Sequence, residues 1–231
     1  MFYSQEEGWT RDAIAAAQVS RLRETLHQAA RSPFYNHRLD EAGIAPETIQ
    51  SPADIRRLPL TNKDDLRNAY PLGLSAVPVE DLVRLHASSG TTGAATAIVY
   101  THNDIRTWAS LMARSLHAAG VRATDVFQNT SGYGLFTGGL GIHYGAEMLG
   151  CLTIPSGSGN TQRQLKLIRD FQVTAVHIIP SYALYLGSVL TQQDIDPREL
   201  PLKRAVIGAE PHTEAVRAKV EALLDLKAFN S

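Results

Sequence analysis

Residues 88–93 combine hydroxyl side chains with glycine, a combination suited to binding an anion. The members of this stretch are Ser88, Ser89, Gly90, Thr91, Thr92 and Gly93. Glycine lets the backbone approach a ligand closely, and backbone N–H groups and hydroxyls supply hydrogen-bond donors for a polyphosphate. The usual nucleotide P-loop has a lysine after its last glycine, whereas Ala94 follows here, so that loop type is disfavoured. On this motif alone, a hairpin without a ligand is an equal alternative.

The segments around this stretch predict the elements that position it. Short strands are expected over 82–87 and 97–100 because of their β-branched and aromatic content. Further strands are expected over 125–129, 151–155, 173–179, 203–208 and 226–229. A helix is expected from a capping box at 101–104 to Gly120, and a second one from the loop 131–141 to Leu149. Three more are expected: from a cap at Thr161 to Phe171, over 181–191 and over 213–224.

This alternation predicts an α/β fold with a mostly parallel sheet flanked by helices. Ligands of such sheets bind at the carboxyl ends of the strands. The loops expected there are 131–141, 156–160, 180–182 and 208–211.

The first third of the chain predicts a helical segment. One apolar stripe indicates a helix over 11–31 that Ser32-Pro33 stops, and a short polar helix is expected over 36–42. Residues 46–81 are rich in proline and charge, which is typical of short turns. We therefore expect 1–81 to be a helical and loop segment packed on a core formed by 82–231.

Composition limits the function. The 231 residues carry a net charge of −1, which argues against nucleic-acid or membrane binding through bulk charge. The one cysteine, Cys151, and the scattered histidines offer no metal-ligand spacing, so no metal site is assigned. We find no signal sequence and no apolar run long enough to span a bilayer, so the cytoplasm is the expected compartment.

Longer motifs resemble a known family. Residues 86–93, 131–141 and 208–214, in this order, resemble the phenylacetate–CoA ligase family of AMP-forming aryl-acid ligases, within the adenylate-forming superfamily. Ser32-Pro33-Phe34-Tyr35, 170–171, 180–182 and 195–199 resemble it too. The family's next motif, Tyr/Phe-Gly-x-Ser/Thr-Glu, is not reached at Ser231, so the resemblance implies an amino-terminal fragment of the large domain.

The resemblance implies a reaction and site residues. ATP with Mg²⁺ would activate an aryl acid as its adenylate, and coenzyme A would then accept the acyl group. Residues 88–93 would hold the ATP phosphates. The adenine would lie on Gly208, Ala209, Glu210 and Pro211, and the aryl acid on Ser131, Tyr133, Gly134 and Phe136. Catalytic residues are expected beyond Ser231, so this chain alone is expected to be inactive. A homodimer is a possible assembly.

The sequence differs from the family at two places, and three other interpretations are open. Ala94-Ala95 replaces a common lysine-proline pair, which predicts weaker ATP binding, and Ser131 replaces a common tyrosine, which predicts room for a bulkier aryl acid. Taken alone, Glu210 could be a solvated charge or a helix-start carboxylate. The chain could be a non-catalytic nucleotide- or ligand-binding α/β module. A dinucleotide-dependent oxidoreductase is disfavoured, because no Gly-x-Gly-x-x-Gly opens a helix after a strand.

Overall fold

The computed structural model describes residues 3–88, 96–135 and 137–231. The chain divides into two compact units, Met1–Asp104 and Ile105–Ser231. The expectations for Ser89 to Gly93, for Ala94-Ala95 and for Phe136 lie outside the described residues. The unit division groups residues 82–104 with the amino-terminal helices, and the expected boundary at 81/82 stays a prediction.

Up to residue 81 the amino-terminal unit consists of helices, 3₁₀ turns and loops. Its helices are α1 (Arg11–Ala29), α2 (Pro33–Glu41) and α3 (Lys63–Asn68), with 3₁₀ turns η1 (Gln5–Gly8), η2 (Pro46–Thr48), η3 (Pro52–Arg57) and η4 (Val79–Asp81). Helix α1 ends at Ala29, and Pro33 is the first residue of α2. Proline fits the first turn of a helix but not a helix interior. A small core of Leu26, Leu39, Ile44 and Ile49 joins these segments.

The expected strand pair forms a hairpin. Strand β1 (Leu82–Ala87) runs antiparallel to β2 (Ala97–Thr101), with Leu85 opposite Val99. Helix α4 (His102–Ala118) follows directly. Its capping box is as predicted: the Thr101 N–H donates to Asp104 Oδ2 (2.8 Å), and the Asp104 N–H donates to Thr101 Oγ1 (3.2 Å).

The carboxyl-terminal unit contains a five-stranded sheet in which every pairing is parallel, so the predicted fold class is confirmed. The strand order is β4-β3-β5-β6-β7. The strands are β3 (Val126–Asn129), β4 (Leu152–Ile154), β5 (Ala175–Ile178), β6 (Arg204–Ile207) and β7 (Lys227–Asn230). Because all five run the same way, their carboxyl ends share one edge of the sheet.

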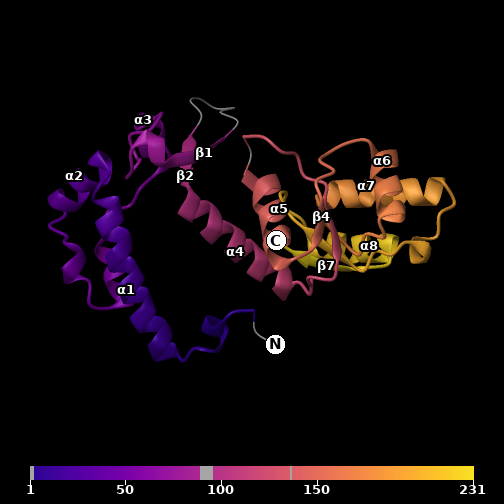
Figure 1. Ribbon diagram of the computed structural model, residues 1–231, viewed down its shortest axis with the longest axis horizontal. Coiled ribbons are helices and arrows are strands. Elements are labelled where there is room, and N and C mark those ends of the chain that lie inside the picture. Colours follow the sequence, from indigo (N-terminus) through magenta and orange to yellow (C-terminus); the bar gives the residue numbers. More distant parts are fainter. Residues whose placement is uncertain (1–2, 89–95, 136) are drawn as a thin grey trace. The chain divides into compact units, whose positions relative to one another are not determined.

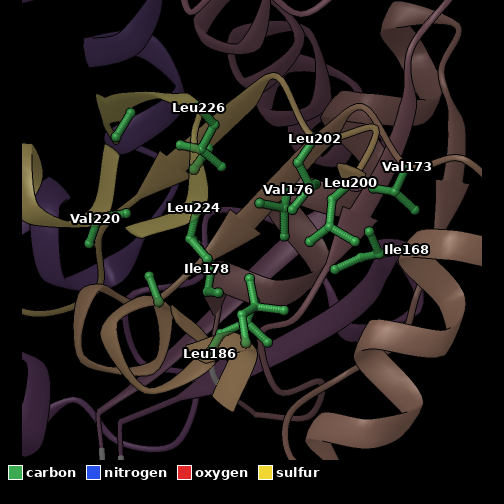
Figure 2. Packing of buried hydrophobic residues seen from close by; sticks show 14 of the residues in the cluster. Ile168, Val173, Val176, Ile178, Leu186, Leu200, Leu202, Val220, Leu224 and Leu226 are labelled. Carbon is green, nitrogen blue, oxygen red and sulfur yellow. The ribbon is translucent and has the colours of Figure 1, made fainter. Parts of the chain in front are cut away.

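Helices cover both faces of this sheet (Figure 1). They are α5 (Thr137–Leu149), α6 (Thr161–Asp170), α7 (Pro180–Gln192) and α8 (Glu214–Leu224), and η5 (Pro197–Glu199) precedes β6. Side chains of α6, α7 and α8 pack on one face, and Figure 2 shows Val176 and Ile178 of β5 among Ile168, Leu186 and Leu224. Leu116 of α4 and Ile142 of α5 pack on the other face, around Phe127.

Two local predictions are wrong. Helix α5 begins at Thr137, inside the expected loop 131–141, because its glycines allow close packing. A Cβ on Gly139 would collide with the Gly132 carbonyl, and a Cβ on Gly141 would collide with the Trp108 ring. The cap of α6 is Asn160, not Thr161: its side chain accepts from the Arg163 N–H, and it adopts the left-handed conformation that asparagine tolerates.

Candidate active site

The carboxyl edge of the sheet carries a buried polar cluster, made by Asn129, Ser131 and His177. Asn129 ends β3, Ser131 follows two residues later, and His177 lies on the neighbouring strand β5. The exposed fraction of the residue is 0% for Asn129 and 4% for both Ser131 and His177. The Thr130 N–H and hydroxyl both donate to the His177 carbonyl (3.1 and 2.8 Å), which extends the pairing of β3 with β5 past the last residue of β3.

Asn129 is the centre of this cluster. Its amide nitrogen donates to the Gly139 carbonyl (2.7 Å) and to the Tyr133 hydroxyl (3.0 Å). Its amide oxygen accepts from the Ser131 N–H (3.2 Å) and lies 3.0 Å from His177 Nδ1. One side chain therefore connects both ends of the segment 131–139, which contains the predicted aryl-acid residues.

Burial keeps His177 neutral. The loss of hydration disfavours the charged ring and lowers the pKa of His177 to about 4. The ring is hydrogen-bonded, with Nδ1 lying 3.0 Å from Ser131 Oγ as well as from Asn129. His177 therefore contacts Ser131, a predicted site residue, directly.

Tyr133 connects the cluster to the surface of α5. Its hydroxyl lies 3.4 Å from His143 Nδ1, and His143 Nε2 lies 3.0 Å from Glu147 Oε1. The Tyr133 and His143 rings meet edge to face, with their centroids 5.8 Å apart. Burial raises the pKa of Tyr133, so its hydroxyl stays protonated at neutral pH.

The predicted aryl-acid residues differ in their exposure. Ser131 is buried, whereas Tyr133 is 38% exposed. Gly134 has φ of 142°, a value that disfavours any other residue at this turn. The structure thus places Ser131 at the inner end of the segment and Tyr133 nearer to solvent.

The predicted adenine residues follow β6 at the same edge of the sheet. A Cβ on Gly208 would meet the Ser231 hydroxyl, so the ends of β6 and β7 lie close together here. Ala209 has φ of 71°. The Glu210 carboxylate accepts from the N–H and the hydroxyl of Ser181, in the first turn of α7. Glu210 is therefore bound at a helix start, one of the two positions that its residue type alone suggested.

His212 fixes the far end of this segment. Its Nε2 lies 2.9 Å from Asn230 Oδ1, and its Nδ1 lies 3.2 Å from the Glu210 carbonyl. These two hydrogen bonds, the Asn230 contact first, raise the pKa of His212. The segment 208–212 is thus attached to α7 at Glu210 and to β7 at His212.

In the amino-terminal unit, Ser88 and Thr96 hold together the two ends of the predicted phosphate-binding stretch. The Ser88 N–H donates to the Thr96 carbonyl (3.1 Å). The N–H and hydroxyl of Thr96 both donate to Ser88 Oγ (3.1 and 3.0 Å). The Ser88 oxygen is thus used as an acceptor from both groups of Thr96.

The roles of Asn129 and His177 were not predicted from the sequence. Each could have been noticed, because each is a polar residue within or at the end of a buried strand. Gln128 is another such residue: its amide nitrogen donates to Gln164 Oε1 (2.6 Å) on α6. Gln164 in turn donates to the carbonyls of Gly157 and Gly159 (2.8 and 3.0 Å), so it shapes the loop after β4.

One groove lies away from these residues. This groove, of about 760 Å³, lies at the opposite, amino-terminal edge of the sheet, lined by Leu202, Lys203, Glu221 and Lys227 among others. None of the predicted site residues lines it. Within residues 3–88, 96–135 and 137–231, no cluster of His, Cys, Asp and Glu could hold a metal ion, and no helix is long and apolar enough to cross a membrane.

Comparison with known proteins defines the class. Residues 14–230 match the family described as AMP-binding enzyme, and the chain belongs to that family. It is similar to the phenylacetate–coenzyme A ligase of Pseudomonas putida, with 48% identity over 95% of this chain and 50% of the relative. The ligase of the same name from Thermus thermophilus is 46% identical over 100% of this chain and 52% of the relative. The resemblance predicted from the motifs is confirmed, and the chain spans about half the length of these relatives.

Solved structures agree with this class. A 2-hydroxyisobutyryl-CoA ligase, in complex with 2-HIB-AMP and CoA in the thioesterification state, superimposes with a TM-score of 0.88 and 28% identity. The match covers 96% of this chain and 49% of that one. An open conformation of the same ligase gives a TM-score of 0.85 at 27% identity, over 94% of this chain and 49% of that one. The fold is therefore that of an adenylate-forming ligase.

Proposed function

We propose that this chain is the amino-terminal part of an AMP-forming ligase that joins an aryl acid to coenzyme A. The observation that carries the proposal is 46% identity to a phenylacetate–coenzyme A ligase along the whole chain. The buried cluster at the carboxyl edge supports it, because this is the edge where parallel sheets bind ligands. The substrates are then three small molecules: the aryl acid, ATP and coenzyme A.

The reaction has two displacements. A carboxylate oxygen of the acid attacks the α-phosphorus of ATP, the bond to the pyrophosphate oxygen breaks, and an aryl-acyl adenylate forms. The thiol sulfur of coenzyme A then attacks the acyl carbon, AMP leaves, and the thiol gives up its proton. Both steps need exact alignment of reactants and stabilisation of charge on phosphate oxygens.

We assign the binding residues as follows. Donors of Ser88 to Gly93 hold the ATP phosphates, and Gly208 to Pro211 border the adenine. Ser131, Tyr133, Gly134 and Phe136 form the aryl-acid site. For Glu210, whose carboxylate is bound to Ser181, we assign a positioning role: it fixes the backbone of 208–211 beside the base.

We propose that Mg²⁺ accompanies ATP in this reaction. The described residues provide no carboxylate cluster that fits it, so we assign none of them to the metal and route no step through it. We expect the complete protein to act in the cytoplasm, where ATP and coenzyme A are supplied. A homodimer is a further proposal, and sedimentation velocity tests it.

The proposal is tested on the complete gene product. Pyrophosphate release is followed with ATP, magnesium and a panel of aryl acids, and thioester formation is followed after coenzyme A is added. Release that depends on the acid supports the ligase. Binding of ATP without release, for every acid tested, contradicts the ligase and supports a non-catalytic nucleotide-binding module.

A further inference from the structure

The two described hydroxyl groups of the predicted aryl-acid site differ in how their hydrogens are used. The Tyr133 oxygen accepts from Asn129 Nδ2 at 3.0 Å. We assign its hydrogen to His143 Nδ1, 3.4 Å away: the other ring nitrogen of His143 faces the Glu147 carboxylate at 3.0 Å and carries the hydrogen of the neutral ring, so Nδ1 is the acceptor. The donor of Tyr133 is therefore already used inside the protein.

The orientation of the Asn129 amide decides which ring nitrogen of His177 carries the hydrogen. The Asn129 nitrogen must face the Gly139 carbonyl at 2.7 Å, since a flipped amide would place two oxygens against each other there. The flip would also turn the amide nitrogen toward the Ser131 N–H, donor against donor. The Asn129 oxygen consequently faces His177 Nδ1 at 3.0 Å, so Nδ1 carries the hydrogen and donates it.

This leaves the hydroxyl hydrogen of Ser131 unused. Ser131 Oγ lies 3.0 Å from the same Nδ1, and it acts as an acceptor there because that nitrogen has no lone pair to offer. Within the described part of the chain, the Ser131 hydrogen meets no acceptor. Ser131 is 4% exposed, so bulk water does not serve it either. A buried donor of this kind is costly to leave unpaired, and a ligand atom can pair it.

We propose that Ser131 selects the substrate of the ligase by donating this hydrogen bond to an acceptor atom on the aromatic part of the acid. The inference rests on the proposed function, which places the aryl acid on Ser131. Ser131 and its partner His177 lie at the buried end of the site, whereas the carboxylate must meet ATP, which enters from solvent. The substrate class is an aryl acid whose ring carries a hydroxyl, an ether oxygen or a ring nitrogen.

A pair of matched acids tests this on the complete gene product. Methoxyphenylacetate and ethylphenylacetate, each as its 2-, 3- and 4-isomer, have nearly the same size, but only the first has an acceptor. At one ring position, kcat/KM for the methoxy acid should exceed that for the ethyl acid by about tenfold, the fold-change of one net hydrogen bond. Ser131→Ala should bring this ratio close to one, and Ser131→Thr should preserve the ratio.

The control is Thr174→Val, which removes a hydroxyl that donates to Asp125 Oδ1 (2.7 Å) at the opposite edge of the same sheet. It should leave the ratio unchanged. Ratios near one at every position in the unsubstituted enzyme, or an unchanged ratio in Ser131→Ala, overturn the inference while acid-dependent pyrophosphate release keeps the proposed function. Absence of release with every acid removes the proposed function and the inference together.

Discussion

The Glu210 carboxylate binds both the N–H and the hydroxyl of Ser181, so the segment after β6 is attached to the first turn of α7. A helix start has unpaired N–H groups and a partial positive charge, and a carboxylate satisfies both. The loop that we assign to the adenine is thus held by a helix that begins at the end of the neighbouring strand. This contact links two of the strand ends that form the candidate site.

Glu210→Ala should lower the free energy of unfolding by about 1–2 kcal/mol, because it removes the capping oxygens of α7. Glu210→Gln should cost less, since one oxygen remains. Urea unfolding measures both. Asp170→Ala, at an exposed carboxylate that pairs with Lys166 on the same helix, is the control and should stay within about 0.5 kcal/mol. Equal effects of Glu210→Ala and the control would contradict a capping role.

The stability of the protein should fall with acid because of His177. Its folded-state pKa is lowered to about 4, whereas an unfolded histidine titrates near 6.5. Between these values the unfolded chain binds a proton that the folded chain rejects, so the unfolding free energy decreases as pH falls from about 6.5 to 4. The full loss is about 3 kcal/mol, at about 1.4 kcal/mol per pKa unit.

His177→Gln isolates this contribution, because glutamine can donate to Asn129 but does not titrate. The difference in unfolding free energy between the original protein and the variant, measured by urea unfolding from pH 7.5 to 4, should change by that amount. A difference that is constant over this range would show that His177 is not the group responsible.

Gly145→Ala should destabilise the packing of α5 on α4. The added Cβ would lie 2.5 Å from Met112 Cβ and 2.9 Å from the Met112 carbonyl carbon, and backbone atoms cannot turn away. We expect a loss of about 1–3 kcal/mol, despite the better helix propensity of alanine. Gly132→Ala is the steric control: its nearest neighbour, Ser158 Oγ, is 3.7 Å away, so its cost in thermal unfolding should be small.

Ala209→Gly should stabilise the protein. Ala209 has φ of 71°, in the left-handed region, where a Cβ costs about 1 kcal/mol and glycine none. The gain in unfolding free energy should be up to about 1 kcal/mol. Ala218→Gly in the middle of α8 is the opposite case and should cost about 1 kcal/mol, because there the backbone is helical. A loss for both variants would mean that Ala209 is unstrained.

Ala94→Lys should strengthen ATP binding in the complete gene product. A lysine at this position restores the positive charge that many family members have, and a charge-assisted hydrogen bond to phosphate should lower KM for ATP by about tenfold. Ala94→Gln provides similar length without charge and should change KM little. Steady-state kinetics at fixed acid concentration compare the two. If glutamine and lysine act alike, the charge is not the cause.

Most of the fold could be predicted because its signals are local. Alternating strand and helix segments predicted the parallel sheet, and the capping box at Thr101 predicted the start of α4. The start of α5 could not be predicted. Its glycines are poor helix formers, and they lie in a helix because Gly139 and Gly141 must approach Gly132 and Trp108. That requirement involves residues on other elements, which the local sequence does not contain.

By itself, the sequence determined the class of protein, the order of its elements and the sheet edge where ligands should bind. Only the tertiary structure decided which polar groups meet there. Asn129 and His177 are 48 positions apart, and their contact depends on the register of β3 beside β5. Ser181 and Glu210 are 29 positions apart and meet because α7 begins beside the end of β6. Hydrogen bonds need atoms within about 3 Å, and at such separations only the packed fold sets that distance.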